Sequence, residues 1–378
     1  MPKITNIKIE ENDVVEFVKK ATDIVKKNIT DADSKLNLNL LDLLPKEKYN
    51  TVSFIIKNTN SSFANAIRRT IVSEVPVWSL ALDVRDYETN DPFLIFDHLA
   101  TKIGSLPIHQ EYIHKFEQNG DNPNDIYTFY INIENNSSEL KYIYSDDIII
   151  NGTSSINKEF SIIKNIPLQY LTPNTFLRTK LILEKGYGYQ NGAKFSITPM
   201  PVYYPNDYIP LETKHKAASS GHSSLITDYK EFYFKYDTYT HYKDPLIILK
   251  MAINEIKKRI NNILNYIDEY IKDPMIPDDI HTNFKKKIVI YKNEFIEIKK
   301  ENHTYFIIIQ GESVTISKLF SRYVYDEHKH IELVTDANEH PSIRSVFIKL
   351  QDHNSIKLMV KAGEKIINDL NSILKDLK

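Results

Sequence analysis

The sequence predicts an α+β protein made of two sheet-plus-long-helix units that form an intramolecular pseudo-dimer, with a β-rich domain inserted in the first unit. Three observations support this prediction. The strand–turn–helix pattern SFIIKNTNSSFANAIRRTIV at 53–72 returns as YFIIIQGESVTISKLFSRYV at 305–324. Two long amphipathic segments, at 249–267 and 359–377, share the same apolar spacing. The first copy carries roughly 142 more residues between these halves than the second, about one small domain.

The composition limits the classes of function. The chain has 378 residues, which is enough for two or three domains with cores of their own. Its formal net charge is −2, so it has no general electrostatic attraction to nucleic acid. The absence of cysteine excludes disulfides, thiol catalysis and thiolate zinc sites. We expect neither a signal peptide, because the N-terminus is charged, nor a membrane span, because no apolar run approaches ~18 residues.

Local patterns then predict the elements in chain order. Apolar residues at helical spacing predict a helix over 13–29. The predicted strands are 49–58, 125–134, 145–152, 175–186 and 231–239. The helix after the first of these strands is expected to have Ser61 or Ser62 as its N-cap. Region 83–228 is expected to be β-rich with long loops, and Asp244-Pro245 to begin a long helix with proline at its first position.

The repeated helices align along their apolar stripes. Phe63, Ile67 and Ile71 match Ile316, Phe320 and Val324. The strands before them align with an offset smaller by one residue, so an extra turn residue is expected in the later copy. Along the long helices, Leu249, Ile253, Ile256, Ile260, Ile263 and Ile267 match Met359, Gly363, Ile366, Leu370, Ile373 and Leu377. Each set forms a heptad-like seam that suits packing against another helix.

We predict that these apolar residues form the interface between the two units. The predicted interface residues are Phe63, Ile67, Leu249, Ile253, Ile256, Ile260, Ile316, Phe320, Met359, Ile366, Leu370 and Ile373. The alternative is that each seam packs only on its own sheet. The predicted domains are a first unit at 1–82 and 228–271, an insert at 83–227, a linker at 272–287 and a second unit at 288–378.

Five segments carry a resemblance to the RNA polymerase α-subunit N-terminal domain family, which includes bacterial α and the third-largest subunit of eukaryotic-type polymerases. SSFANAIRRTIVSEVP at 61–76 resembles the family signature, and HLATKIGSLPI at 98–108 resembles the segment that follows it. KGYGYQNGAKFS at 185–196 resembles the family's loop with paired glycines. GESVTISKLF at 311–320 and EHPSIRSVFIKLQ at 339–351 resemble the small eleventh subunit of the eukaryotic-type enzyme.

The resemblance implies a fusion of the third-largest and eleventh subunits, similar to those of large nucleocytoplasmic DNA viruses. The heavy use of Ile, Asn, Lys and Tyr suits such an AT-rich genome. The chain departs from the family in three places. It lacks the cysteine-ligated zinc loop of many third subunits, it has an extra helix and the segment 36–45 near its N-terminus, and a Lys-rich linker joins its halves.

The resemblance also implies the partners. We expect the largest and second-largest polymerase subunits, a small subunit resembling the tenth and, as a further candidate, the twelfth. We expect no sequence-specific DNA contact, no membrane and no cofactor. The residues expected to bind the second-largest subunit are Asn65, Arg68, Arg69, Lys102, Lys185, Gly186, Gly188 and Lys194.

Helical spacing alone places Asn65, Arg68 and Arg69 in one surface patch. A solvated face is the alternative interpretation of such an arginine pair. Glu74 is the nearest acid in sequence, but it lies five residues past Arg69, which is not a spacing that pairs on a helix.

A few residues could suggest catalysis or metal binding. Asp146-Asp147 and Asp278-Asp279 are paired carboxylates, but each pair stands alone, which favours solvated surface over a magnesium site. HKH at 328–330 has no third ligand nearby in the sequence. Gly186-Tyr187-Gly188 lacks the remaining residues of a phosphate loop. The sequence therefore predicts no catalytic residues of its own.

The sequence thus predicts a non-catalytic assembly platform for the two large subunits of a multisubunit DNA-dependent RNA polymerase. The alternative is a stand-alone scaffold or nucleic-acid-binding protein that reuses the fold. We expect an intracellular protein, located in the host cytoplasm (viral factory) and virion if it is viral and in the nucleus otherwise.

The chain is expected to fold without metal, because it has no cysteine and its histidines lack zinc-finger spacing. Elemental analysis of the purified chain should find no stoichiometric zinc. One tightly bound zinc per chain would contradict this expectation.

Overall fold

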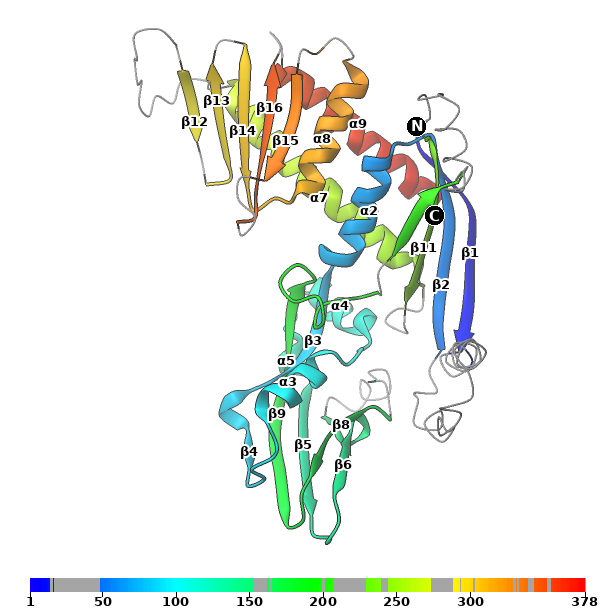
Figure 1. Cartoon of the computed structure of the whole chain (residues 1–378), viewed down its shortest axis with the longest axis vertical. Helices are drawn as coiled ribbons and strands as arrows, with labels where there is room; N and C mark the ends of the chain where they lie inside the picture. Colours follow the sequence, from blue (N-terminus) through cyan, green and yellow to red (C-terminus); the bar gives the residue numbers. More distant parts are fainter. Residues whose placement is uncertain are drawn as a thin grey trace, which may run out of the picture.

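The computed structural model describes residues 1–13, 16, 48–151, 162, 165–198, 201–206, 229–238, 244–272, 288–292, 294–301, 303–328, 331, 333–338, 343–351 and 355–377. The predicted helix over 13–29, the segment 36–45 and nearly all of the predicted linker lie outside these residues. The predicted α+β class is confirmed by several antiparallel sheets with packed helices. The molecule is elongated, with two sheets and their helices at one end and a separate sheet-rich region at the other (Figure 1).

The first unit is an antiparallel sheet with strand order β1-β2-β11-β10. Its elements are β1 (Lys3–Asp13), β2 (Lys48–Lys57), α2 (Ser61–Ser73), β10 (Val202–Pro205), β11 (Glu231–Thr238) and α7 (Leu246–Lys272). Alternate residues of β2 and β11 face the helices, and Phe54 stacks on Phe234 with ring centroids 5.1 Å apart. The predicted strands at 49–58 and 231–239 and the predicted long helix are therefore confirmed.

The helix starts differ from prediction by one residue. Asn60, and neither Ser61 nor Ser62, is the N-cap of α2, because its side-chain oxygen accepts a hydrogen bond from the Phe63 N–H at 2.9 Å. The long helix α7 begins one residue after the proline, and the Asp244 carboxylate accepts from the Leu246 N–H at 2.9 Å.

The second unit repeats this arrangement with strand order β12-β13-β14-β16-β15. Its elements are β12 (Ile288–Lys292), β13 (Ile296–Glu301), β14 (Thr304–Gln310), α8 (Val314–Glu327), β15 (Leu333–Asn338), β16 (Ser345–Gln351) and α9 (Ser355–Asp376). In both units a central strand pair supports a short helix and a long helix.

The predicted extra turn residue in the second copy is wrong. Phe54 pairs with Phe234 in the first sheet, and the buried pair at the same place in the second sheet is Ile307 with Ile348. The sequence alignment matched Phe54, which faces the core, with Phe306, which faces away from it. A shift of one residue has this effect because side chains alternate between the two faces of a strand. Three residues separate strand from helix in both copies, and each turn begins in the left-handed region, at Asn58 with φ 56° and at Gly311 with φ 75°.

One hydrophobic core spans both units. Helices α2, α7, α8 and α9 pack against one another (Figure 1), and buried residues from both sheets join the same cluster. All of the residues predicted for the interface are buried in this cluster. Gly363 marks the close approach of the long helices, because a Cβ atom there would lie 2.6 Å from the Leu264 side chain on α7.

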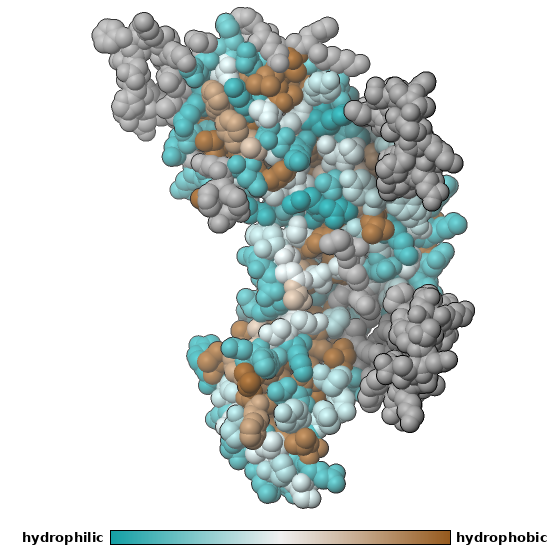
Figure 2. All heavy atoms as spheres, viewed as in Figure 1, coloured by the Kyte–Doolittle hydropathy of each residue, from teal (hydrophilic) through white to brown (hydrophobic). Residues whose placement is uncertain are grey.

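Most of the inserted region packs around its own core and extends away from the two units (Figure 1). Its residues Phe195 and Ile197 join the core that the two units share. Its main sheet has the order β3-β9-β5-β7, with β4 beside β9, and a separate hairpin-like pair is formed by β6 and β8. These strands are β3 (Pro76–Leu82), β4 (Glu88–Thr89), β5 (Thr128–Asn135), β6 (Lys141–Tyr144), β7 (Ile149–Asn151), β8 (Pro167–Leu171) and β9 (Thr175–Tyr187). Hydrophobic and hydrophilic residues are interspersed over its visible surface (Figure 2).

The insert also contains helices that were not predicted. They are α3 (Phe96–Gly104), α4 (Gln110–Gln118) and the short α5 (Pro123–Ile126). Each is short, and neither α3 nor α4 has a side-chain N-cap hydrogen bond, so the usual start signal was missing from the sequence. The chain enters this sheet through β3, before the predicted boundary at 83, and the predicted domain boundaries stay predictions.

Replacing both Ile256 and Ile366 with Asp is expected to unfold or aggregate the protein. Both side chains are fully buried, and each unpaired carboxylate costs several kcal/mol, against a net stability of about 5–15 kcal/mol for a domain. Thermal unfolding followed by circular dichroism measures the effect. Ile271→Asp is the matched control, because Ile271 is on the same helix α7 but is 41% exposed. A double variant with the wild-type melting temperature would contradict the predicted interface.

Candidate functional site

The sequence of α2 explains how it presents two arginines. Phe63, Ile67 and Ile71 are buried in the shared core, which fixes the inward face of the helix. On the other side Arg69 is exposed and Arg68 is half-buried. The Arg68 Nε donates to the Asn65 side-chain oxygen at 3.0 Å, as the predicted spacing allows.

The arginines of the two copies differ in their partners. Within the described part of the chain, neither Arg68 nor Arg69 forms an ion pair. Ser73 occupies the position four residues after Arg69, and its hydroxyl donates to the Arg69 carbonyl at 2.8 Å. In the second copy the same position is Asp326, which pairs with Arg322 at 2.9 Å. Among the described residues, Arg69 of the first copy therefore has no carboxylate partner, whereas Arg322 of the second copy is paired with one.

Glu74 pairs with arginines of other elements and not with those of α2. Glu74 is 4% exposed, and its carboxylate lies 2.5 Å from the Arg344 guanidinium and 3.4 Å from that of Arg259. Arg259, on α7, also forms an ion pair with Glu312, which lies in the turn between β14 and α8. Burial acts to lower the pKa of Arg259, but the two carboxylates outweigh it and the pKa is raised. The guanidinium is thus held in its charged form.

This ion network joins all three parts of the molecule. Tyr189, in the loop after β9, lies over the Arg344 guanidinium with 3.8 Å between the carbon and the ring centroid. Its backbone N–H donates to the Ser73 carbonyl at 3.2 Å. The insert is therefore attached both to the end of α2 and to the second unit. Sequence reasoning missed the network, although Arg259 is a charged residue inside an apolar helix seam, and that anomaly was a usable signal.

The paired glycines allow this loop to approach α2. A Cβ atom on Gly188 would lie 2.4 Å from the Val72 carbonyl oxygen, and one on Gly186 would lie 2.3 Å from the Phe195 ring. Contacts this short do not occur for real Cβ atoms, and in the Gly188 case the neighbour is backbone. Both positions thus serve close packing of the loop.

The predicted lysines lie around the strand that carries Trp78. Lys185 pairs with Glu117 and lies 5.9 Å from the Trp78 ring centroid. Lys194 pairs with Glu184 and lies 5.2 Å from the Phe195 ring. Lys102 is exposed on α3. Unlike Arg69, the first two lysines are therefore partly neutralised.

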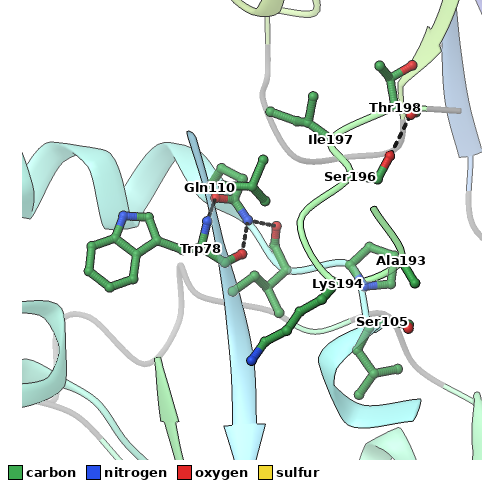
Figure 3. Close-up of a pocket in the computed structure, with 12 residues that line it drawn as sticks. Trp78, Ser105, Gln110, Ala193, Lys194, Ser196, Ile197 and Thr198 are labelled. Carbon is green, nitrogen blue, oxygen red and sulfur yellow. Dashed lines mark hydrogen bonds between the residues drawn. The ribbon is translucent and has the colours of Figure 1, made fainter. Parts of the chain in front are cut away.

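A cavity of about 250 Å³ opens beside Lys194. It is lined by residues of β3, of the turn before α4 and of the segment 193–198, and Figure 3 shows that the Gln110 amide holds the Trp78 backbone on its wall. Arg69 lines a different cavity, between α2 and α8. Of the residues predicted for one partner site, Lys194 lines the first cavity and Asn65 and Arg69 line the second, while the others line neither of these two.

The carboxylate pairs and histidines that could suggest catalysis have structural roles at the positions that the structure describes. The Asp147 carboxylate accepts from the Tyr144 N–H at 2.8 Å, and Asp146 accepts from the Asn165 N–H, so this pair shapes a turn. His328 ends α8, while 329–330 and Asp278-Asp279 lie outside the described residues. Among the described residues, no three His, Asp or Glu side chains gather as metal ligands, and no helix is long and apolar enough to cross a membrane.

Comparison with known proteins places these elements in a family. The family described as the RNA polymerase Rpb3/Rpb11 dimerisation domain matches residues 53–260, more than half of the chain. The matched residues run from β2 to α7 and include α2, the insert and the glycine loop. The second unit lies outside the match.

Individual relatives are similar to smaller parts of the chain. DNA-directed RNA polymerase II subunit rpb3 of Dictyostelium discoideum is 25% identical over 167 residues, which cover 41% of this chain and 54% of that protein. DNA-directed RNA polymerase subunit Rpo3 of Pyrococcus furiosus is 28% identical over 136 residues, covering 35% and 49%. Subunit RPB3 of Schizosaccharomyces pombe RNA polymerase II is 23% identical over 118 residues, covering 28% and 39%. The chain spans about half the length, or less, of these relatives.

Arg259→Ala is expected to lower the free energy of unfolding by about 3–5 kcal/mol, because it leaves the Glu74 and Glu312 carboxylates buried without their shared cation. Urea unfolding followed by tryptophan fluorescence measures the change. Lys258→Ala is the matched control, since Lys258 is exposed on the same helix and should change stability by less than about 0.5 kcal/mol. Equal stability of the two variants would show that the network does not hold the parts together.

Proposed function

The chain belongs to the RNA polymerase Rpb3/Rpb11 dimerisation domain family, and from this premise we propose that it is a non-catalytic assembly subunit of a multisubunit DNA-dependent RNA polymerase. The observation that carries the proposal is the family match across β2, α2 and α7, together with the single core that these elements share with the second unit. The similar polymerase subunits of Dictyostelium discoideum and Pyrococcus furiosus support the same class.

The second unit would take the place of a separate partner chain. It repeats the sheet, the short helix and the long helix of the first unit, and its α8 and α9 cover the apolar faces of α2 and α7. We therefore propose an intramolecular pseudo-heterodimer, a fusion of a third-subunit-like and an eleventh-subunit-like unit. Covalent connection keeps the two halves at high effective concentration, so the platform forms without a bimolecular step.

The two faces of the platform would bind different large subunits. On the first copy, Arg68 and Arg69 have no acidic partner among the described residues, and a guanidinium binds carboxylates and carbonyls in fixed geometry. We assign this face to the second-largest subunit and the second unit to the largest. Lys102, Lys185 and Lys194, with the glycine loop, extend the first face toward the insert.

Further proposals follow from the polymerase assignment. Small subunits resembling the tenth, or the twelfth, would complete the assembly. The fusion proposed above, together with a composition suited to AT-rich DNA, leads us to propose an origin in a large nucleocytoplasmic DNA virus, with the protein in the viral factory and virion. The competing function is a stand-alone scaffold or nucleic-acid-binding protein. Purification from the native source separates the two, because co-migration with large polymerase subunits supports assembly and a free monomer supports the alternative.

The double variant Arg68→Ala with Arg69→Ala should stay folded but capture the second-largest subunit less well. Truncating one side of a charged interface contact costs roughly 2–5 kcal/mol of binding free energy. Co-expression followed by affinity pull-down measures capture, and circular dichroism checks the fold. Arg178→Ala is the control, because this exposed arginine already pairs with Glu134 on the insert. Normal capture by the folded double variant would reduce the arginine pair to a solvated face.

A further inference from the structure

A small polar cavity lies where the two units meet, between α2 and the first turns of α8. Its volume is about 160 Å³. Its walls include Ser62, Asn65 and Arg69 of α2, Tyr203 of β10, and Thr315 and Lys318 of α8. Neither unit alone would form it, because each contributes one of its two cations.

Among the described residues, two cationic side chains and no acidic residue line the cavity, which makes it positive. Within the described part of the chain, neither Arg69 nor Lys318 forms an ion pair. The first residues of both α2 and α8 line it, and neither helix carries an acidic residue in its first turn. Helix N-termini bear partial positive charge, so they add to the field of the two side chains.

A buried polar side chain and an uncapped helix start lie beside the cavity. Thr315 lines the cavity and is only 6% exposed, and its solvent-inaccessible hydroxyl oxygen forms no hydrogen bond within the part of the chain that the structure describes. The N-cap of α8, Ser313, makes no side-chain capping bond, so the first N–H groups of the helix lack that acceptor. Helix N–H groups that lack a capping acceptor are available to an incoming anion.

We propose that this cavity binds the carboxylate of one acidic side chain of the second-largest polymerase subunit, held by Arg69 of the first unit and Lys318 of the second. The proposal rests on the function proposed above and names the chemistry of its contact. The size suits a single side chain, since small-molecule pockets are typically about 300–1,000 Å³. A nucleic acid is disfavoured, because binding its backbone requires several phosphate contacts and the cavity offers only two cations.

The pseudo-symmetric position does not repeat the site. Lys318 corresponds to Asn65 and Arg322 to Arg69, but the Arg322 guanidinium already pairs with Asp326. An acidic side chain therefore finds two available cations in only one of the two orientations of the pseudo-dimer. The cavity thus selects which way round the platform meets this subunit.

Zero-length carbodiimide crosslinking of the co-expressed complex tests the contact directly. The reagent joins a lysine amine to a carboxylate only when the two touch, and digestion with mass spectrometry identifies the joined residues. We expect Lys318 to be joined to an Asp or Glu of the second-largest subunit, and Arg69→Lys to add a second crosslink to the same acidic segment. A complex in which other lysines crosslink to that subunit and Lys318 does not would overturn the proposal.

Capture by single variants gives an independent measurement. Lys318→Ala should weaken capture of the second-largest subunit about tenfold, and Arg69→Ala with Lys318→Ala should lose less than the two single losses combined, because both cations serve one carboxylate. Lys361→Ala, at an exposed position of α9, is the matched control and should capture normally. Capture by Lys318→Ala equal to that of the control would contradict the proposal.

The outcomes separate this proposal from the proposed function. If the double arginine variant loses capture while Lys318→Ala does not, the assembly function stands and the composite carboxylate site fails. If the wild-type chain captures no large subunit, both fail. If a short DNA duplex binds the isolated chain through Lys318 and displaces the large subunit from it, the ligand is a phosphate and the carboxylate assignment is wrong.

Discussion

The fold depends on covering the apolar faces of two long helices. Each sheet buries only part of its long helix, and α7 and α9 would expose apolar seams if either unit stood alone. Packing α7 against α9, with α2 and α8 completing the bundle, removes these seams from water in one contiguous core. The absence of a side chain at Gly363 lets Leu264 fill the crossing. This core positions the surfaces of both units, whereas most of the insert packs around a core of its own.

Charged positions make the two halves unequal. Arg259 corresponds to Asp369 along the long helices, and Glu312 corresponds to Thr59 in the turns. On the first side these positions form a closed ion network, whereas on the second side Thr59 and Asp369 line an open cavity of about 400 Å³. Burial raises the pKa of Asp369, which accepts the Tyr323 hydroxyl at 2.8 Å. The two similar units therefore differ in charge at corresponding positions of their seam, which makes the two sides of the pseudo-dimer distinguishable.

The sequence was sufficient for the features that depend on local period. Runs of β-branched and aromatic residues identified β2 and β11, apolar spacing identified the helices of both units, and the repeat paired them. The alignment of the two repeated strands was wrong by one residue, matching Phe54 to Phe306. Adjacent residues of both strands are apolar, so the sequence does not distinguish the two alignments. The sequence also did not predict the ion network, because Glu74, Arg259 and Arg344 are far apart in the chain and meet only after the two units pack.

Packing of the insert against α2 and the second unit, in addition to its chain connections, fixes its orientation. Gly188 lets the loop after β9 lie against the last turn of α2, where any side chain would collide with the backbone. The next residue, Tyr189, then reaches the guanidinium of Arg344, which itself neutralises Glu74. The carboxylate at the end of α2 is therefore shared by both units and capped by the insert. Because the arginine pair lies on the same short helix, its direction relative to the insert is fixed by this arrangement, and a partner that contacts both surfaces meets them in one geometry.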